Sequence, residues 1–212
     1  MIASSKRISN PGCYPTGFLA LVRPLVEAGL APADWPFTLN AVSGYSGGGK
    51  AMIAEFEDEA SPTFTRVPFR IYAMNLAHKH VPEMQVHAGL KHPPLFAPAV
   101  GRYAQGMIVE VPLQLFALPK KPSPAALHQA LGAAYEREQF IEVASLAEAA
   151  AKKTLDPEGL NGTNRMKLYV FANAETGQAR LVALLDNLGK GASGAAVQNM
   201  NLALGLDEAA GL

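Results

Sequence analysis

Cysteine and net charge are what this sequence has least of. It holds one cysteine, Cys13, and its 18 basic and 18 acidic residues leave no net charge at pH 7. A single cysteine cannot form a disulfide within the chain, so we expect a reducing, cytosolic setting. The balanced charge excludes the basic excess that is typical of dedicated nucleic-acid binders. We therefore expect no nucleic-acid partner.

Long hydrophobic runs are also missing. The most apolar stretch, GMIVEVPLQLFALP, is interrupted by Glu110 and Gln114 and is too short to span a bilayer. The opening MIASSKRIS has no apolar run after its basic residues, unlike a signal peptide. We expect a soluble, cytoplasmic protein that is not attached to a membrane. A hydrophobic content of 49% is enough for a sizeable core.

A dinucleotide-binding motif is a third absence. Neither G-x-G-x-x-G nor G-x-x-G-x-x-G follows a strand near the N-terminus. The sequence therefore shows no evident dinucleotide-binding βαβ unit.

The elements that are present predict an α+β fold. Thr16–Ala28 predicts a helix with Pro15 in its first turn and a stop at Gly29, and Pro24 implies a kink or a break. Alternation and turn residues predict strands and helices in the remaining segments. The expected strands are 37–42, 69–75, 106–118 with Pro112 at an edge or bulge, 138–144, and a hairpin of 167–173 and 179–187. The expected helices include 51–57, the latter half of 76–90 with Pro82 in its first turn, 123–138 with Ser123 as N-cap, and 193–204.

Cys13 occupies an unusual local setting, SNPGCYPTGF. It lies just before a predicted helix, whose first amides and dipole favour a thiolate. Gly12 allows close approach to a bound group, and Pro11 and Pro15 stiffen the turn. A buried cysteine that only fills core volume is the alternative. The Pro-Gly-Cys turn favours a nucleophile.

The segment HKHVPEM places two histidines near Glu83. A nucleophilic cysteine needs a general acid/base, and histidine is the usual one near neutral pH. His78 and His80 are both candidates, because spacing alone cannot separate them. Zinc binding is a rival, but two histidines and one distant cysteine give no complete ligand set, so we expect no metal site. Exposed histidines at a helix start are the other alternative.

Two glycine-rich loops could hold an anion or a cofactor. SGYSGGGK, residues 43–50, offers backbone amides, hydroxyls and an ammonium, although it lacks Walker A spacing. NLGKGASG, residues 187–194, opens the last predicted helix, and a plain glycine turn is its alternative. Arg165 could bind a substrate carboxylate, but an exposed arginine at a strand start is an equal alternative.

Several of these segments together resemble the N-acetyl-gamma-glutamyl-phosphate reductase family, particularly its shorter type. NPGCYPTG, SGYSGGGK, HKHVPEM and LLDNLGKGASGAAVQNMNLALGL carry the resemblance, which runs from Ile8 to about Asp207. It implies the catalytic and dimerisation domain shared with glyceraldehyde-3-phosphate and aspartate-semialdehyde dehydrogenases. The implied sheet is largely antiparallel or mixed, with helices on one face.

The resemblance also implies a reaction, a cofactor and site residues. The family reduces N-acetyl-γ-glutamyl phosphate, an acyl phosphate, to N-acetylglutamate 5-semialdehyde with NADPH in arginine biosynthesis. Cys13 matches the nucleophile that forms a thioester, and His80 matches the acid/base. The implied cofactor residues are Asn187, Gly189, Lys190, Gly191 and Gly44. The resemblance also implies that the loop 43–50 lies near the substrate phosphate and the nicotinamide. With this loop and the candidates above, the residues expected to contact substrate or phosphate are Asn10, Ser43, Ser46, Lys50, Arg165 and His78.

Family members begin with an NADP-binding Rossmann domain, which has no counterpart before Cys13 here. We therefore expect residues 1–212 to form one catalytic and dimerisation domain, with a final helix near 193–204 that would pack against the missing domain. The chain alone should keep thiol chemistry but show little or no reductase turnover. The resemblance implies a homodimer or homotetramer.

Two other functions stay open. The chain could belong to a related reductase that acts on aspartyl phosphate or on carrier-linked aminoadipyl phosphate. It could also be a non-catalytic, self-associating domain, and a fast, low-pKa Cys13 would distinguish a working site from such a remnant.

Overall fold

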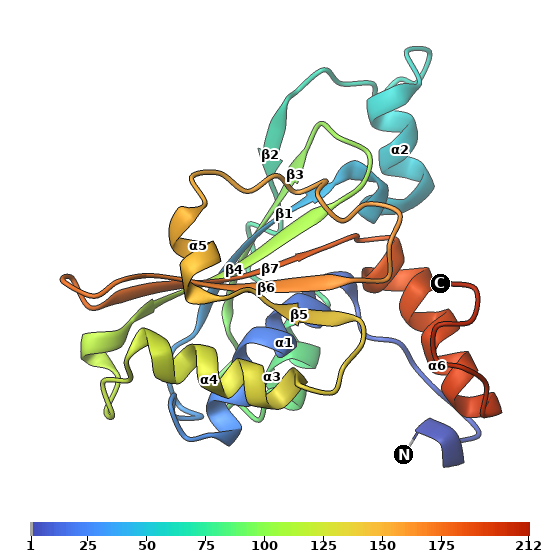
Figure 1. Cartoon of the computed structure of the whole chain (residues 1–212). Helices are drawn as coiled ribbons and strands as arrows, with labels where there is room; N and C mark the ends of the chain where they lie inside the picture. Colours follow the sequence, from blue (N-terminus) through green and yellow to red (C-terminus); the bar gives the residue numbers. More distant parts are fainter. Residues whose placement is uncertain (1) are drawn as a thin grey trace.

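The protein is described by a computed structural model over residues 2–212, which form a seven-stranded sheet (Figure 1). The strand order is β2-β3-β1-β4-β7-β6-β5. The pairs β1/β3 and β5/β6 are parallel and the other pairs are antiparallel, so the predicted mixed α+β sheet is confirmed. The strands are β1 (Thr38–Gly44), β2 (Phe69–Ile71), β3 (Leu95–Gly101), β4 (Met107–Gln114), β5 (Ile141–Val143), β6 (Met166–Asn173) and β7 (Gln178–Leu185).

Three helices cover one face of this sheet and one short helix lies on the other (Figure 1). The covering helices are α1 (Cys13–Glu27), α3 (Val81–His87) and α4 (Pro124–Tyr135). The short helix α5 (Leu146–Ala151) packs Ala149 against Tyr169 and Val182, which point to the opposite face. The expectation that helices lie on only one face of the sheet is therefore wrong for α5. The remaining helices are α2 (Gly49–Glu57) and α6 (Gly194–Leu204), with single turns at η1 (Ile2–Ser4), η2 (Tyr45–Gly48), η3 (Leu115–Ala117) and η4 (Gly189–Ser193).

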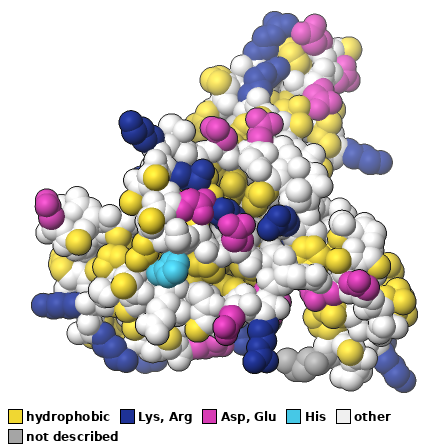
Figure 2. Space-filling view, in the orientation of Figure 1, with side chains coloured by type: hydrophobic (Ala, Val, Ile, Leu, Met, Phe, Trp, Pro, Cys, Tyr) yellow, Lys and Arg dark blue, Asp and Glu magenta, His cyan; other side chains and the backbone are white. Residues whose placement is uncertain are grey.

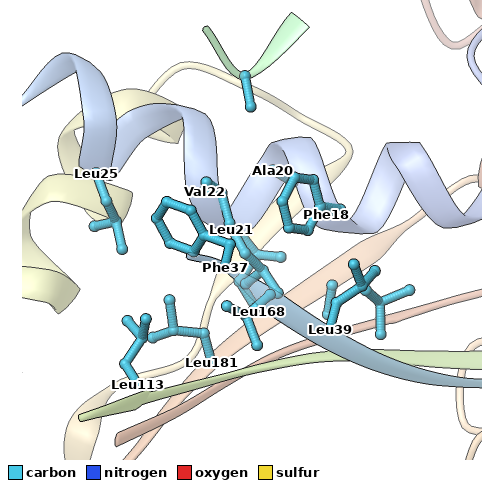
Figure 3. Packing of buried hydrophobic residues seen from close by; sticks show 14 of the residues in the cluster. Phe18, Ala20, Leu21, Val22, Leu25, Phe37, Leu39, Leu113, Leu168 and Leu181 are labelled. Atoms are coloured by element: carbon cyan, nitrogen blue, oxygen red, sulfur yellow. The ribbon is translucent and has the colours of Figure 1, made fainter. Parts of the chain in front are cut away.

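The main core lies between α1 and the sheet (Figure 3). Phe18 and Leu21 of α1 are fully buried, and Leu168 and Leu181 meet them from β6 and β7. Burying one such side chain contributes about 2–3 kcal/mol. This packing holds the first turn of α1, and therefore Cys13, in a fixed place over the sheet.

Helix α1 is longer than predicted and is not broken by its proline. It begins at Cys13 rather than Thr16 and runs unbroken through Pro24, so a break at this proline, one of the two predicted outcomes, is wrong. Because Pro24 has no amide hydrogen, the carbonyl of Ala20 lacks its helical donor. The hydroxyl of Tyr135 donates to that carbonyl instead, at 2.9 Å. The predicted stop is confirmed, because Gly29 has φ +63°.

Pro112 lies in an interior strand, but beyond the part of it that pairs with β1. The pairing of β4 with β1 ends at Glu110 opposite Asn40, whereas its pairing with β7 continues past Pro112, which lies opposite Arg180. Pro112 therefore sits where one side of β4 has no partner strand, which is how an interior strand tolerates a proline.

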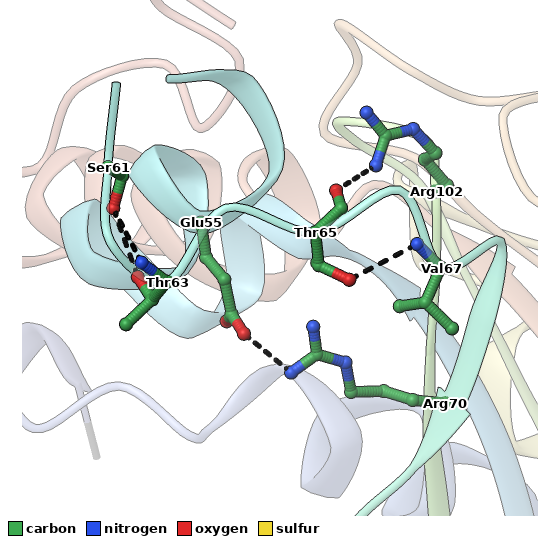
Figure 4. Close-up of polar contacts among 7 residues, drawn as sticks. All are labelled: Glu55, Ser61, Thr63, Thr65, Val67, Arg70 and Arg102. Atoms are coloured by element: carbon green, nitrogen blue, oxygen red, sulfur yellow. Dashed lines mark hydrogen bonds and ion pairs between the residues drawn. The ribbon is translucent and has the colours of Figure 1, made fainter. Parts of the chain in front are cut away.

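Most other predicted elements are present with shifted ends. The β6–β7 hairpin, α3 with Pro82 in its first turn and α6 with its stop at Gly205 are confirmed. Between η2 and β2, helix α2 and the loop after it project from the sheet (Figure 1). Arg102 donates to the carbonyl of Thr65, and Arg70 pairs with Glu55 at 2.8 Å (Figure 4). Arg102 also donates to the carbonyl of Phe56. No helix among residues 2–212 has the length and apolar character needed to cross a membrane.

Replacing Ser123 by alanine should lower the free energy of unfolding by about 1 kcal/mol. Its hydroxyl accepts from the amide of Ala126 at the start of α4, as the sequence predicts. Urea unfolding of the purified chain measures the change. Ser123→Asp keeps an acceptor at the cap and should lose much less stability, so equal losses in both variants would contradict the capping role.

Candidate active site

Cys13 is the first residue of α1, and the ring of His80 lies against the turn that precedes it. A Cβ added to Gly12 would lie 2.6 Å from Cε1 of His80, so only glycine leaves room for this imidazole. Cys13 itself is half-buried. The structure therefore brings the two candidate catalytic residues, Cys13 and His80, to one place although they are far apart in the sequence.

Glu83 holds the same turn through a hydrogen bond to its backbone. Its Oε1 accepts a hydrogen bond from the amide of Gly12 at 3.0 Å. Helix α3 has Pro82 in its first turn, and this turn presents Glu83 toward the cysteine. The sequence indicated that Glu83 was near the histidines but did not make it a site residue. The signal available in the sequence was the acidic side chain of Glu83 within HKHVPEM, three residues after His80.

The two histidines have different surroundings. His78 lies among aromatic rings, with centroids 5.8 Å from Tyr72 and 5.1 Å from Phe96, and its Nδ1 accepts from the amide of His80 at 3.1 Å. Nδ1 of His80 is buried and has no hydrogen-bond partner among the described residues. His78 thus serves the packing and orients the backbone of His80, whereas the ring of His80 faces the cysteine turn.

Burial keeps both imidazoles neutral near pH 7. It lowers the pKa of His80 to about 4, helped by the nearby His78 and Lys79. Burial also lowers the pKa of His78, again with a contribution from Lys79. A neutral imidazole can accept a proton, so His80 is in the form that a general base requires. Among residues 2–212, no group of three or more His, Cys, Asp or Glu side chains is placed to hold a metal ion.

The expected low-pKa thiol is not what the structure provides. Burial raises the pKa of Cys13 above the ordinary value, and the carboxylate of Glu83 adds to this. Backbone hydrogen bonds at Tyr14 and Cys13 and the charge of Lys79 act in the opposite sense but are outweighed. The helix start favours the thiolate as predicted, yet desolvation dominates. The prediction of an activated thiolate in the free chain is therefore wrong.

The alkylation rate of Cys13 by iodoacetamide should keep rising with pH beyond the range in which a free thiol levels off. The reagent reacts with the thiolate, and a raised pKa moves the thiolate population to higher pH. Because Cys13 is the only cysteine, labelled mass reports this residue alone. The urea-unfolded chain is the control, and a native midpoint at or below the unfolded one would contradict the burial effect.

The C-terminal loop Asn187–Gly191 packs directly against the cysteine. A Cβ on Gly191 would lie 2.8 Å from the Cβ of Cys13. Asn187 accepts from the amide of Gly106 at 2.7 Å and donates to the hydroxyl of Ser46 at 3.0 Å. The buried Lys190 donates to Gln198 at 2.6 Å, and burial lowers the pKa of this lysine. A Cβ on Gly189 would meet the carbonyl of Thr163.

The first glycine-rich loop lies beside the C-terminal one. Asn187 joins the two through Ser46. Ser43 is buried and donates to the carbonyl of Gly44, and Gly44 packs tightly against the backbone of Ala104. Lys50, at the start of α2, is exposed. The loop is thus held mainly by contacts with residues 103–106 and with Asn187, while Lys50 is directed to solvent.

Two predicted substrate residues have partners elsewhere. Oδ1 of Asn10 accepts from Asn199 of α6 at 2.6 Å. The exposed Arg165 lies 3.7 Å from Glu142 of β5, at the edge of the sheet. The structure thus gathers Cys13, His80 and the two glycine-rich loops, and it gives Asn10 and Arg165 contacts outside this group.

The chain is similar to known proteins over nearly all of its length. Residues 13–187 match the family model described as semialdehyde dehydrogenase, dimerisation domain. The chain is 52% identical to an N-acetyl-gamma-glutamyl-phosphate reductase of Trichormus variabilis, over all of this chain and 67% of that protein. It is 55% identical to one of Brucella anthropi, over 96% of this chain and 66% of that protein. The chain thus spans about two thirds of the length of these relatives.

Solved structures show the same fold at lower identity. A probable aspartate-semialdehyde dehydrogenase from Pseudomonas aeruginosa matches with a TM-score of 0.64 and 18% identity, over 93% of this chain and 62% of that one. Aspartate semialdehyde dehydrogenase II from Vibrio cholerae matches with a TM-score of 0.62, 18% identity and the same coverage. Taken with the close relatives and the matched domain, these findings show that the chain belongs to the N-acetyl-gamma-glutamyl-phosphate reductase family, within its semialdehyde dehydrogenase dimerisation domain.

Proposed function

We propose that the chain carries the acyl-transfer step of N-acetyl-γ-glutamyl phosphate reduction. The sulfur of Cys13 attacks the acyl carbon, a C–S bond forms, the bond from that carbon to the phosphate oxygen breaks, and phosphate leaves. The product is a thioester on Cys13. The observation that carries this proposal is the imidazole of His80 lying against the Gly12–Cys13 turn at the start of α1.

His80 takes the thiol proton in this step. Because burial raises the pKa of Cys13, few free chains carry a thiolate at pH 7, and attack needs a base beside the thiol. His80 is neutral at this pH and can accept the proton. Glu83 accepts a hydrogen bond from the amide of Gly12, which keeps the Gly12–Cys13 turn in place beside the imidazole of His80. The chemistry thus depends on the histidine rather than on a preformed thiolate.

The family implies NADP(H), which donates hydride to the thioester when it is bound. The residues predicted to bind the cofactor already make hydrogen bonds within the chain, so they are poorly suited to bind it. Asn187 is bonded to Gly106 and Ser46, Lys190 to Gln198, and the amide of Gly191 to the carbonyl of Asp186. Of these three residues, Gly191 also packs against Cys13. We therefore expect weak cofactor binding and little reductase turnover from this chain alone.

Helix α6 is the surface that we propose for contact with the cofactor-binding part of longer family members. Met200 and Leu204 on this helix are 52% and 65% exposed. Both lie beside the N-terminal segment, in a groove of about 330 Å³ that includes Ile8.

Rapid mixing with N-acetyl-γ-glutamyl phosphate, without cofactor, tests the proposed step. We expect a burst of close to one phosphate per chain, since without NADPH no hydride donor is present to reduce the thioester and free Cys13. Aspartyl phosphate is the matched competitor and should give a slower burst. A faster burst with aspartyl phosphate would favour a related reductase, and no burst with either would favour a non-catalytic domain.

Self-association through the open sheet face is the second part of the proposal. Phe69 and Ile71 of β2 and Leu95 of β3 are 53%, 59% and 50% exposed, beside an apolar depression of about 430 Å³. The view in Figure 2 shows hydrophobic side chains between interspersed charges of both signs. The name of the matched domain supports a second copy of the chain as the partner.

Ile71→Asp should shift the chain to a smaller assembly in sedimentation velocity, because it places a charge in this apolar face. Val86→Asp, at a 70% exposed position of α3 on the other side of the sheet, is the control and should leave the mass unchanged. A wild-type chain that sediments as a monomer would contradict the proposed self-association.

A further inference from the structure

Asp186 is a fully buried carboxylate that the proposed reaction does not use. It follows β7 directly and has no exposed surface. Burying a charged group is costly unless hydrogen bonds compensate it. The donors around this carboxylate therefore indicate what it does.

Three segments of the chain donate to Asp186. Its Oδ2 accepts from the side chain of Gln105 and from the amide of Gly162, the latter at 2.8 Å. Its Oδ1 accepts from the amide of Leu188 at 2.8 Å. Hydrogen bonds to an ionised carboxylate are stronger than those between neutral groups. Asp186 thus ties together the turn before β4, the turn before β6 and the start of the C-terminal loop.

Asp186 also connects these three segments to Cys13. The backbone carbonyl of Asp186 accepts from the amide of Gly191 at 2.8 Å. Gly191 is the residue whose missing Cβ leaves space for Cys13. A shift of the loop at Leu188 would therefore move Gly191 against or away from the cysteine.

We propose that Asp186 is a positioning residue for Cys13. Its carboxylate fixes the C-terminal loop Asn187–Gly191 so that Gly191 closes one side of the thiol. This keeps Cys13 half-buried and aligned with His80. The effect on catalysis rests on the proposed function, whereas the effect on the exposure of the thiol does not.

Asp186→Asn tests this role with two readouts. Asparagine keeps the shape but turns amide hydrogens toward the Gly162 or Leu188 donor, so the loop should loosen. We expect iodoacetamide to label Cys13 about threefold faster, because the thiol becomes less buried. The phosphate burst should slow about tenfold, because a small misplacement of a reacting group is costly. A general loss of activity would not move the two rates in opposite directions.

Two further variants keep the test decisive. Gln105→Met removes one donor and leaves Asp186 in place, so it should change both rates in the same directions but less; it decides the question if Asp186→Asn does not fold. Asp156→Asn, at an exposed position, is the charge-matched control and should change neither rate.

A folded Asp186→Asn chain with the wild-type alkylation rate would overturn the positioning role. If the wild-type chain gives no phosphate burst, the proposed function fails, and the alkylation rates still decide the role of Asp186.

Discussion

Replacing Cys13 by serine is expected to abolish the phosphate burst, with a loss of about a thousandfold or more in the acylation rate. Serine has the same shape, so the turn against His80 and Gly191 should remain in place. A hydroxyl is a far weaker nucleophile than a thiol at this site, since its proton is much harder to remove. Stopped-flow detection of phosphate, with and without the substitution, measures the effect.

Thiol chemistry elsewhere cannot complicate this result, because the chain has no other cysteine. Thr176→Ser, in the exposed turn between β6 and β7, is the control and should keep the full burst. Circular dichroism should show that the serine variant is folded. A burst of normal size and rate from Cys13→Ser would show that another group receives the acyl chain.

Replacing His80 by glutamine is expected to slow acylation by about 10²–10³-fold and to change its pH dependence. The pKa of His80 is lowered to about 4, so the neutral base is fully present above about pH 5 and is lost as the pH falls through 4. The wild-type rate should therefore be nearly flat from pH 6 to 8. Without the base, the rate should follow the thiolate of Cys13 and climb about tenfold per pH unit over that range.

Two histidine controls separate the base from its neighbours. His78→Gln should reduce the rate less and keep the flat profile, because His78 acts through packing and through the amide of His80. His87→Gln, exposed in the last turn of α3, should change neither the rate nor the profile. A flat profile in His80→Gln would remove this histidine from the proton-transfer role, whatever the size of the rate loss.

Much of the fold could be predicted because local signals and burial agree. The cap at Ser123 and the stops at Gly29 and Gly205 depend only on neighbouring residues. The unbroken α1 could not be predicted, because the hydroxyl that replaces the missing donor at Pro24 comes from Tyr135 of α4. Tertiary contacts decide such cases, and the local pattern does not contain them.

The site was predictable in its residues more than in its electrostatics. The Pro-Gly-Cys turn and HKHVPEM pointed to Cys13 and to either His78 or His80, and the fold brings the ring of His80 to the cysteine turn. The raised pKa of the thiol follows from desolvation by segments distant in the sequence, so the helix start alone gave the wrong direction. Asp186 was missed, although a charged residue directly after the apolar run Leu181–Leu185 was a usable signal.

The most direct test of the account is the mass of the chain after brief mixing with N-acetyl-γ-glutamyl phosphate and acid quenching. We predict a single N-acetylglutamyl adduct that peptide mapping places on Cys13 and that hydroxylamine removes, as expected of a thioester. Release of phosphate from a chain that stays unmodified, or an adduct on any other residue, would contradict the claim that Cys13 receives the acyl group.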